Sequence, residues 1–314
     1  MFSPQRLSRP LSAFDHAARR WTALPLRPLA PLHNLGERLS LISWNIQASS
    51  WVKRVERSQL ILDRILKGPK SPDIIFLQEV ASEVRRSLLD DPRVRSSFLA
   101  SDAEDDKDFK GVPFATMTLL SNERFVSPSN VLAEKDGSEG KGEGRGGSKM
   151  VLDSVFRMTL PSRYQRDALC VNVRDPATPG NVLRLLNVHL DSLDSHFRRA
   201  YEIFLLDRLL REGGCSGGVI AGDFNAVEPN DLTLVEKFGL VDAWVKLHGR
   251  TTGRDEGATW GVGVELEDGL EPGRLDKVVM LGLEPADIEI LQPGLVGPST
   301  PWSDHCGLRC TFTV

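Results

Sequence analysis

Oxygen-bearing side chains follow two short apolar runs in the first third of the chain. Asn45 directly follows the run 41–44, and Gln78 and Glu79 follow the run 74–77. A carboxylate and an amide oxygen suit a hard cation such as Mg²⁺, which prefers oxygen ligands and keeps bound water. Taken alone, Glu79 could be a solvated strand end and Asn45 the close of a turn. Together, the two residues predict an oxygen-rich metal site.

The segment Gly222-Asp223-Phe224-Asn225 follows another apolar run, at 219–221. Asp223 and Asn225 are two residues apart, so their side chains point the same way along an extended chain. One of them can hold or deprotonate water while the other orients the water or binds a phosphate oxygen. The alternative is an Asx turn, which favours the same residue types.

Two histidines lie at comparable positions. In Ser303-Asp304-His305 an aspartate that can bind a metal adjoins an imidazole that can donate a hydrogen bond to a phosphoryl oxygen. Asp276 can accept from the other ring nitrogen of His305 and so fix its tautomer. His189 ends the apolar run 183–188. A single histidine is more often a surface or core residue, but the shared position at strand ends favours one active site.

The elements that must position these residues are buried strands, which read as short apolar runs. We expect strands at 39–45 and 73–79, joined by a helix whose apolar residues recur near helical spacing until Gly68 and Pro69. A strand, a helix and a strand of this length predict a crossover unit of an α/β protein.

Further strands are expected at 117–120, 168–173, 182–190, 219–221 and 307–314, with 168–190 forming a hairpin. Asp194 is expected to cap a helix that ends at Gly213 and Gly214. The expected apolar face of that helix consists of Phe197, Tyr201, Phe204, Leu205 and Leu209. With no internal repeat, these elements predict a sandwich of two β-sheets flanked by helices.

Composition limits the function classes. The chain has 314 residues, 40% of them hydrophobic, which is enough for one domain of ordinary size. The chain contains no run of about 18 apolar residues, so a membrane span is not expected. The four cysteines lack the spacing of a disulfide framework or a zinc site, which favours a reducing compartment. Because the net charge is -4, any affinity for nucleic acid must come from a local patch or from the site itself.

Two segments are expected to lie outside the folded core, which we place at 39–314. Residues 1–38 hold six arginines and several prolines against Asp15 and Glu37, which predicts a disordered basic tail, with a targeting segment as the alternative. Residues 134–149 are dominated by Gly, Lys, Glu and Ser and cannot bury enough apolar surface to fold. They predict a disordered insertion.

The order of the polar motifs resembles that of the endonuclease/exonuclease/phosphatase superfamily over residues 39–314. The matching motifs are Trp44-Asn45, Leu77-Gln78-Glu79, His189, Gly222-Asp223-Phe224-Asn225, Arg274-Leu275-Asp276 and Ser303-Asp304-His305. The resemblance implies a metal-dependent phosphodiesterase built on an α/β two-sheet sandwich.

By the same resemblance, Glu79 would be the principal ligand of Mg²⁺, or alternatively Mn²⁺, with Asn45 and Asp304 supporting the metal. Asp223 would activate the attacking water and Asn225 would help to place it. The phosphoryl group would be stabilised by His189 and by His305, which Asp276 orients.

Motifs outside this set resemble the tyrosyl-DNA phosphodiesterase 2 subfamily. They are Ser43-Trp44-Asn45, the stretch 73–80, Pro161-Ser162 with Arg166, His189-Leu190-Asp191-Ser192, Val241-Asp242-Ala243-Trp244 and Thr259-Trp260. The resemblance implies Mg²⁺-dependent hydrolysis of 5′-phosphotyrosyl ends of single-stranded DNA, which is repair of topoisomerase adducts. It also implies a monomeric nuclear enzyme, with the mitochondrion as the alternative location. Arg166 and Trp260 would contact the DNA, unless they form a surface salt bridge and a packed core aromatic.

Two departures from the subfamily concern the substrate groove and the N-terminus. Pro113 falls near a position where an aromatic substrate contact is expected, and residues 1–38 do not resemble a ubiquitin-binding module. The alternative enzymes are an abasic-site endonuclease, an RNA 3′-exonuclease, and a lipid or inositol phosphate hydrolase. A catalytically silent binding module is the alternative from another class.

Overall fold

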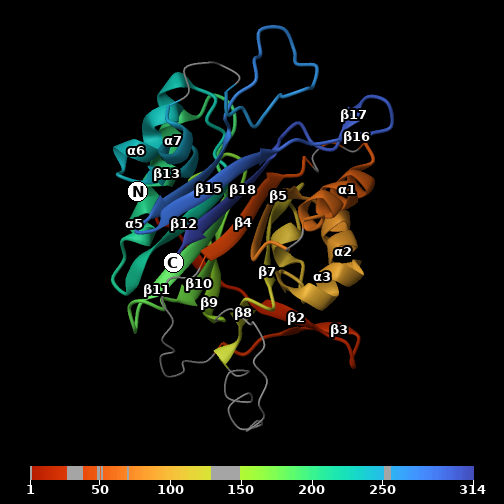
Figure 1. Cartoon of the computed structure of the whole chain (residues 1–314), viewed down its shortest axis with the longest axis vertical. Helices are drawn as coiled ribbons and strands as arrows, with labels where there is room; N and C mark the ends of the chain where they lie inside the picture. The colour runs from red at the N-terminus through yellow and green to blue at the C-terminus, as the bar shows by residue number, and fades with distance from the viewer. Residues whose placement is uncertain are drawn as a thin grey trace.

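Two mixed β-sheets pack face to face in the computed structural model, with helices on both outer sides (Figure 1). The structure describes residues 2–26, 38–47, 50, 52–68, 71–128, 149–250 and 256–314. The predicted sandwich of two sheets flanked by helices is therefore confirmed. None of the helices in these ranges has the length and apolar character that a membrane crossing requires.

The first sheet carries three of the candidate site residues. Its spatial order is β1 (Arg6–Ser8), β9 (Met150–Thr159), β10 (Asp167–Arg174), β11 (Val182–His189), β12 (Cys215–Asp223), β14 (Asp276–Leu281) and β13 (Val241–Asp242), and β8 (Phe125–Val126) pairs with β9. The predicted hairpin is present, because β10 and β11 pair antiparallel. The strand register sets His189 opposite Asp223 and Asp223 opposite Asp276. Three neighbouring strands thus bring these side chains to one level.

The second sheet contains the predicted crossover. Its order is β15 (Glu284–Leu291), β18 (Gly307–Thr313), β4 (Arg38–Asn45), β5 (Ile74–Val80), β7 (Ala115–Ser121), β6 (Phe98–Ser101), β2 (Leu11–Asp15) and β3 (Arg20–Ala23). Strands β4 and β5 run parallel, with Asn45 opposite Gln78. A separate small sheet pairs β16 (Leu295–Val296) with β17 (Thr300–Pro301).

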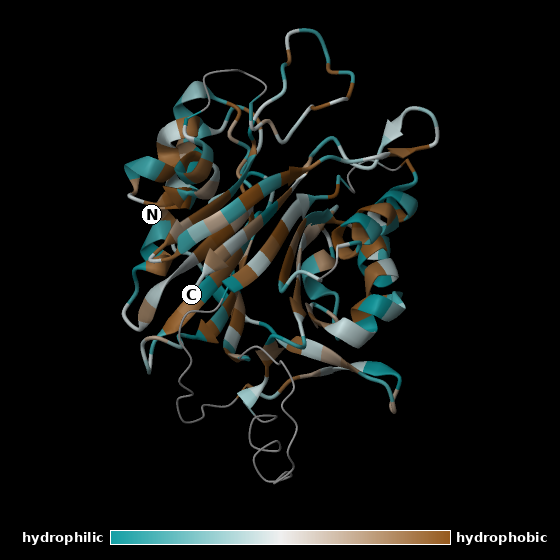
Figure 2. Ribbon diagram, viewed as in Figure 1, coloured by the Kyte–Doolittle hydropathy of each residue, from teal (hydrophilic) through white to brown (hydrophobic). Residues whose placement is uncertain are grey.

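The apolar residues of the strands form a core between the sheets and one core under each group of helices. One group consists of α1 (Arg54–Leu66), α2 (Ser82–Asp90) and α3 (Pro92–Ser97), beside the second sheet. The other includes α5 (His196–Leu210) and α6 (Leu234–Lys237), and α7 (Ala243–His248) contacts β14 and β15. The short helices η1 (Lys107–Phe109) and η2 (Pro229–Thr233) lie in loops. Figure 2 shows the hydrophobic residues concentrated on the central strands.

Helix α5 differs from its prediction in both cap and buried face. Its N-cap is Ser195 rather than Asp194. Phe197 is 89% exposed, whereas Arg199 and Glu202 are fully buried. The physical reason is pairing: Arg199 forms ion pairs with acids of the 228–231 segment, and Glu202 accepts the backbone N–H of Asp191. A pattern of apolar residues cannot detect a buried face that contains paired charges.

The prediction of a disordered tail at 1–38 is wrong for residues 6–23. These residues form β1, which pairs with β9, and the β2–β3 hairpin, which pairs with β6 at the edge of the second sheet. Leu11 is fully buried there, and Arg9 forms an ion pair with Asp108. Residues 27–37 lie outside the described residues, as does the predicted insertion except Lys149, which directly precedes β9.

We expect Gly222→Ala to destabilise the fold at the edge that carries Asp223. Gly222 has a φ of 148°, and an added Cβ would lie 1.9 Å from the carbonyl oxygen of Val188 in the neighbouring strand. The backbone must therefore shift, and a loss of about 1 kcal/mol or more of unfolding free energy is expected. Urea unfolding measures it. Gly213→Ala is the matched control, because an added Cβ there meets nothing within 4 Å. Equal unfolding midpoints for the two variants would contradict the prediction.

Candidate active site

The predicted catalytic and metal-binding residues converge at one edge of the sandwich. They lie at or near the ends of β4, β5, β11 and β12, at the start of β14, and just before β18. In chain order they are Asn45, Glu79, His189, Asp223, Asn225, Asp276, Asp304 and His305. Both sheets contribute residues to the edge, so the site exists only when the two sheets are packed together.

The carboxylate of Asp223 is at the centre of this arrangement and is 1% exposed. Its Oδ2 accepts a hydrogen bond from Asn45 Nδ2 at 2.9 Å and lies 3.3 Å from His189 Nε2. Its Oδ1 accepts the backbone N–H of Asn225 at 2.8 Å. That last bond is the Asx turn considered as the alternative for this motif. The turn is present, and it leaves Oδ2 to face the other site residues.

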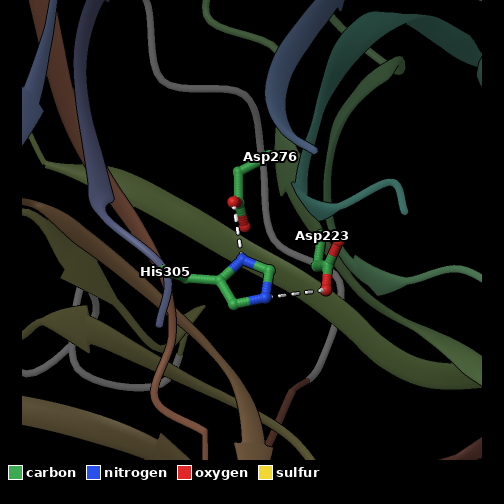
Figure 3. Close-up of side chains that lie close together, drawn as sticks. All are labelled: Asp223, Asp276 and His305. Atoms are coloured by element: carbon green, nitrogen blue, oxygen red, sulfur yellow. Dashed lines mark hydrogen bonds and ion pairs between the residues drawn. The ribbon is translucent and has the colours of Figure 1, made fainter. Parts of the chain in front are cut away.

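His305 is held on both sides by carboxylates (Figure 3). Its Nδ1 lies 2.8 Å from Asp276 Oδ2, and its Nε2 lies 3.8 Å from Asp223 Oδ2. The backbone of His305 is fixed as well, because its carbonyl accepts from Trp44 Nε1 and its N–H donates to Ser303 Oγ. Asp276 thus contacts one ring nitrogen of His305, which is the contact expected from the sequence.

The environments of the two imidazoles push their pKa values in opposite directions. Burial opposes the charge of His305, but the carboxylates of Asp276 and Asp223 raise its pKa to about 10. Burial, and then the nearby charges of Arg166 and His305, lower the pKa of His189 well below its usual value. Burial also raises the pKa of Asp223 to about 7, against the attraction of His305. At neutral pH, His305 is charged and His189 is neutral.

The oxygen donors on the outer side of this cluster fit a hard cation. Glu79 is only half-buried and its Oε1 lies 3.5 Å from Asn45 Nδ2, while the Oδ1 of Asn45 accepts the backbone N–H of Gln47. Trp260 Nε1 donates to Asp304 Oδ2 at 3.1 Å, whereas Asp304 Oδ1 is buried and has no hydrogen-bond partner within the described ranges. A buried carboxylate oxygen that accepts no hydrogen bond from the described residues and lies 4.0 Å from His305 Nε2 is compatible with a metal ligand.

Three other residues of the site lie close enough together to bind a metal ion, but the protonation of one of them argues against metal binding. Ligand atoms of Asp223, Asp276 and His305 lie within 4.8 Å of one another. The charged His305 ring has no lone pair for a metal, since one nitrogen is bonded to Asp276 and the pKa is raised to about 10. We therefore interpret these three residues as an acid–base cluster.

An aromatic residue that the sequence analysis missed contacts His189. The ring of Phe114 stacks on the His189 ring with centroids 5.9 Å apart. The guanidinium of Arg166 lies 5.0 Å from the Phe114 ring and 5.5 Å from the Tyr164 ring. Phe114 directly follows Pro113, so an aromatic is present one residue beyond the position where it was expected. Arg166 does lie beside the catalytic cluster.

Arg57 is a second missed residue and ties together the two segments that carry the metal-type donors. Its guanidinium donates to the carbonyl of Trp302 at 2.6 Å and to the carbonyl of Gln47 at 2.9 Å. Its pKa is lowered by burial, against the attraction of Asp304 and Glu79. An arginine on an amphipathic helix normally extends into solvent, so the sequence contains no signal for this role.

The chain matches the model of the Endonuclease/Exonuclease/phosphatase family over residues 42–305. No curated protein matches it. Among solved structures, D. rerio TDP2 complexed with single strand DNA product has a TM-score of 0.65 at 18% identity, covering 88% of this chain and 100% of that chain. Truncated Caenorhabditis elegans TDP2 has a TM-score of 0.63 at 18% identity, covering 88% and 98%.

The human Nocturnin catalytic domain with bound sulfate anion has a TM-score of 0.57 at 20% identity, covering 93% of this chain and 98% of that chain. These identities establish a shared fold. The family model spans most of the chain and includes the site residues from Asn45 to His305. The chain therefore belongs to the Endonuclease/Exonuclease/phosphatase family and is a metal-dependent hydrolase of phosphoester bonds.

Proposed function

We propose that this protein hydrolyses 5′-phosphotyrosyl ends of single-stranded DNA with Mg²⁺ as its cofactor. The observation that carries the proposal is the position of Asp223 Oδ2, 3.3 Å from His189 Nε2 and 3.8 Å from His305 Nε2. A base that faces a neutral and a charged imidazole is suited to in-line hydrolysis at phosphorus. The structural likeness to TDP2 complexed with single strand DNA product supports the choice of substrate.

In the proposed reaction, Asp223 accepts a proton from water as the water oxygen attacks phosphorus. The bond from phosphorus to the phenolic oxygen breaks, and the phenolate leaves with the bonding electron pair. His305 donates a hydrogen bond to a phosphoryl oxygen while Asp276 holds its other nitrogen. Asn225 steadies Asp223 through its backbone N–H, because its side-chain amide is engaged by the carbonyl of Leu190.

Glu79, Asn45 and Asp304 would hold the Mg²⁺, which supplies charge neutralisation at the phosphoryl oxygens when it is bound. Arg166 adds a positive charge near His189, and the indole of Trp260 donates a hydrogen bond to Asp304. In the proposal these two side chains contact the nucleic acid.

The leaving group provides a test of the substrate. A phenol has a pKa of about 10, several units below a sugar alcohol, so phenolate departs with little help from a general acid. We expect faster hydrolysis of 5′-tyrosyl single-stranded DNA and of nitrophenyl thymidine phosphodiester than of an abasic duplex or oligoadenylate. Product release under Mg²⁺ measures the order. Preference for either of the last two substrates would overturn the proposed substrate.

In the same assay, we expect Glu79→Ala to lower turnover of the nitrophenyl ester by roughly a hundredfold or more, because the metal contributes several kcal/mol to the barrier. Glu289→Ala is the matched control, since that carboxylate is 49% exposed on β15 and pairs with Arg309. Equal turnover of the Glu79 variant and the wild type would show that Glu79 is not a metal ligand.

The pKa values predict a bell-shaped dependence of kcat/KM on pH. Asp223 must be deprotonated to accept the proton, so activity rises with pH through about 7. His305 must keep its proton, so activity falls as pH rises through about 10. Asp276→Asn removes a carboxylate that holds the proton, so the falling limb should move toward lower pH. An upper limb that stays in place in this variant would count against the assigned role of Asp276.

A further inference from the structure

A cavity of about 500 Å³ lies beside the N-terminus of α5. The turn that contains Arg163 lines one part of it, and His196, Phe197, Arg198 and Tyr201 of the helix line another. None of the residues to which we assigned a catalytic or metal-binding role lines this cavity. The cavity is therefore a candidate binding site outside the catalytic cluster.

Three aromatic side chains lie on one face of α5, of which Phe197 is largely exposed and Tyr201 is half-buried. Phe197 is 89% exposed, and Tyr201 and Phe204 follow four and seven residues later, on the same face of the helix. The rings of Tyr201 and Phe204 stack with centroids 5.9 Å apart and an interplanar angle of 14°. A phenylalanine left in water loses the favourable free energy of burial, so a row of exposed rings is a candidate binding surface.

Arginines accompany these rings. Arg163 and Arg198 line the cavity, and the guanidinium of Arg208 lies 5.9 Å from the Phe204 ring. Arg198 is 3.7 Å from Asp191 and still 42% exposed. In the lining of the cavity, Arg163 and Arg198 lie with two carboxylates, those of Asp194 and Glu228. Such a combination of aromatic faces and arginines suits bases that stack and phosphates that pair.

The two acidic residues of the cavity differ in their surroundings. Glu228 accepts hydrogen bonds from Arg199 and from the backbone N–H of His196. Its charge is therefore already engaged by the protein. Asp194 is the other acid that lines the cavity, and it is exposed to solvent.

Planar groups connect the catalytic cluster to this surface. His189 stacks on Phe114, Phe114 faces Arg166, and Arg166 also faces Tyr164. The next residue toward the N-terminus, Arg163, lines the cavity. Asp191 holds the two parts together, because it accepts the backbone N–H of Arg163 at 3.1 Å and lies in the segment that joins His189 to α5. The residues around His189 and the cavity beside α5 are therefore neighbours, joined by the 163–166 turn and the 191–192 segment.

We propose that Arg163, Phe197, Arg198 and Tyr201, the α5 platform, bind the single-stranded nucleic acid that leads away from the reacting phosphate. Bases stack on Phe197 and Tyr201, and the two arginines contact backbone phosphates. The platform deepens the proposed function and rests on it. It extends the contact with substrate beyond the nucleotide that is cleaved.

The test measures binding rather than turnover, with EDTA present to prevent cleavage. Fluorescence anisotropy gives the affinity for a 5′-phosphorylated thymidine dinucleotide and for a strand of about twelve nucleotides, which can span a stacking surface. We expect the wild type to bind the longer strand more tightly. Phe197→Ala should weaken that binding about tenfold, in the range typical of one lost base stack. Arg163→Ala should lower the salt dependence of binding by roughly 0.7 in log–log slope.

Leu7→Ala is the control, because Leu7 is an exposed apolar residue on the edge strand β1 and is 45% exposed. Its affinity for both strands should equal that of the wild type. Circular dichroism checks that Phe197→Ala is folded, as expected for a side chain so exposed. Equal binding of the long strand by Phe197→Ala and the wild type, or no effect of length in the wild type, would overturn the platform.

Two further outcomes separate the possible causes of failure. If sedimentation shows a dimer that Phe197→Ala abolishes without changing DNA affinity, the surface belongs to a second copy and the platform is wrong. Hydrolysis of the nitrophenyl thymidine ester by the wild type tests the proposed function independently, since that substrate is too short to reach α5. A protein that cleaves the ester but shows no length effect refutes the platform alone.

Discussion

The buried carboxylate of Asp223 is the interaction on which the rest of the site depends. A carboxylate that is 1% exposed requires partners, and here they come from both sheets. Asn45 of β4 and the backbone N–H of Asn225 donate hydrogen bonds to it, and the rings of His189 and His305 lie 3.3 Å and 3.8 Å away. Removal of one partner of such a buried charge typically costs about 3–5 kcal/mol. The groups around this carboxylate therefore also hold the two sheets together at the catalytic edge.

Asp276 on one side and Arg166 on the other explain why the two histidines beside this carboxylate differ. His305 lies between Asp223 and Asp276, and these charges keep it protonated. Burial keeps His189 neutral, and the charge of Arg166, which lies 5.0 Å from the Phe114 ring that stacks on His189, adds to this effect. The half-buried Glu79 and Asp304 remain toward solvent, where a cation can reach them. The side of the site that contains Asp223 and His305 is thus suited to proton transfer, and the side that contains Glu79 and Asp304 is suited to hold the metal.

Residues at strand ends could be predicted from the sequence because a buried strand reads as an apolar run and its last residue is fixed by register. The converging site residues, the β10–β11 hairpin and the two-sheet sandwich were found in this way. Features that depend on pairing across long sequence distances were missed. Arg199 is buried on α5 because acids from another loop neutralise it, and β1 to β3 exist because distant strands pair with them. Arg57 and Phe114 act through contacts that spacing along the chain does not encode.

The proposed proton transfer depends on the charge of the His305 ring, and nitrogen NMR of the imidazole measures this charge most directly. We predict that both ring nitrogens of His305 carry protons at neutral pH and that the ring titrates near 10. Asp276→Asn should lower the pKa of His305 toward the ordinary value of about 6.5. A His305 ring that is neutral at pH 7 to 8 in the wild type would contradict the assigned role of His305.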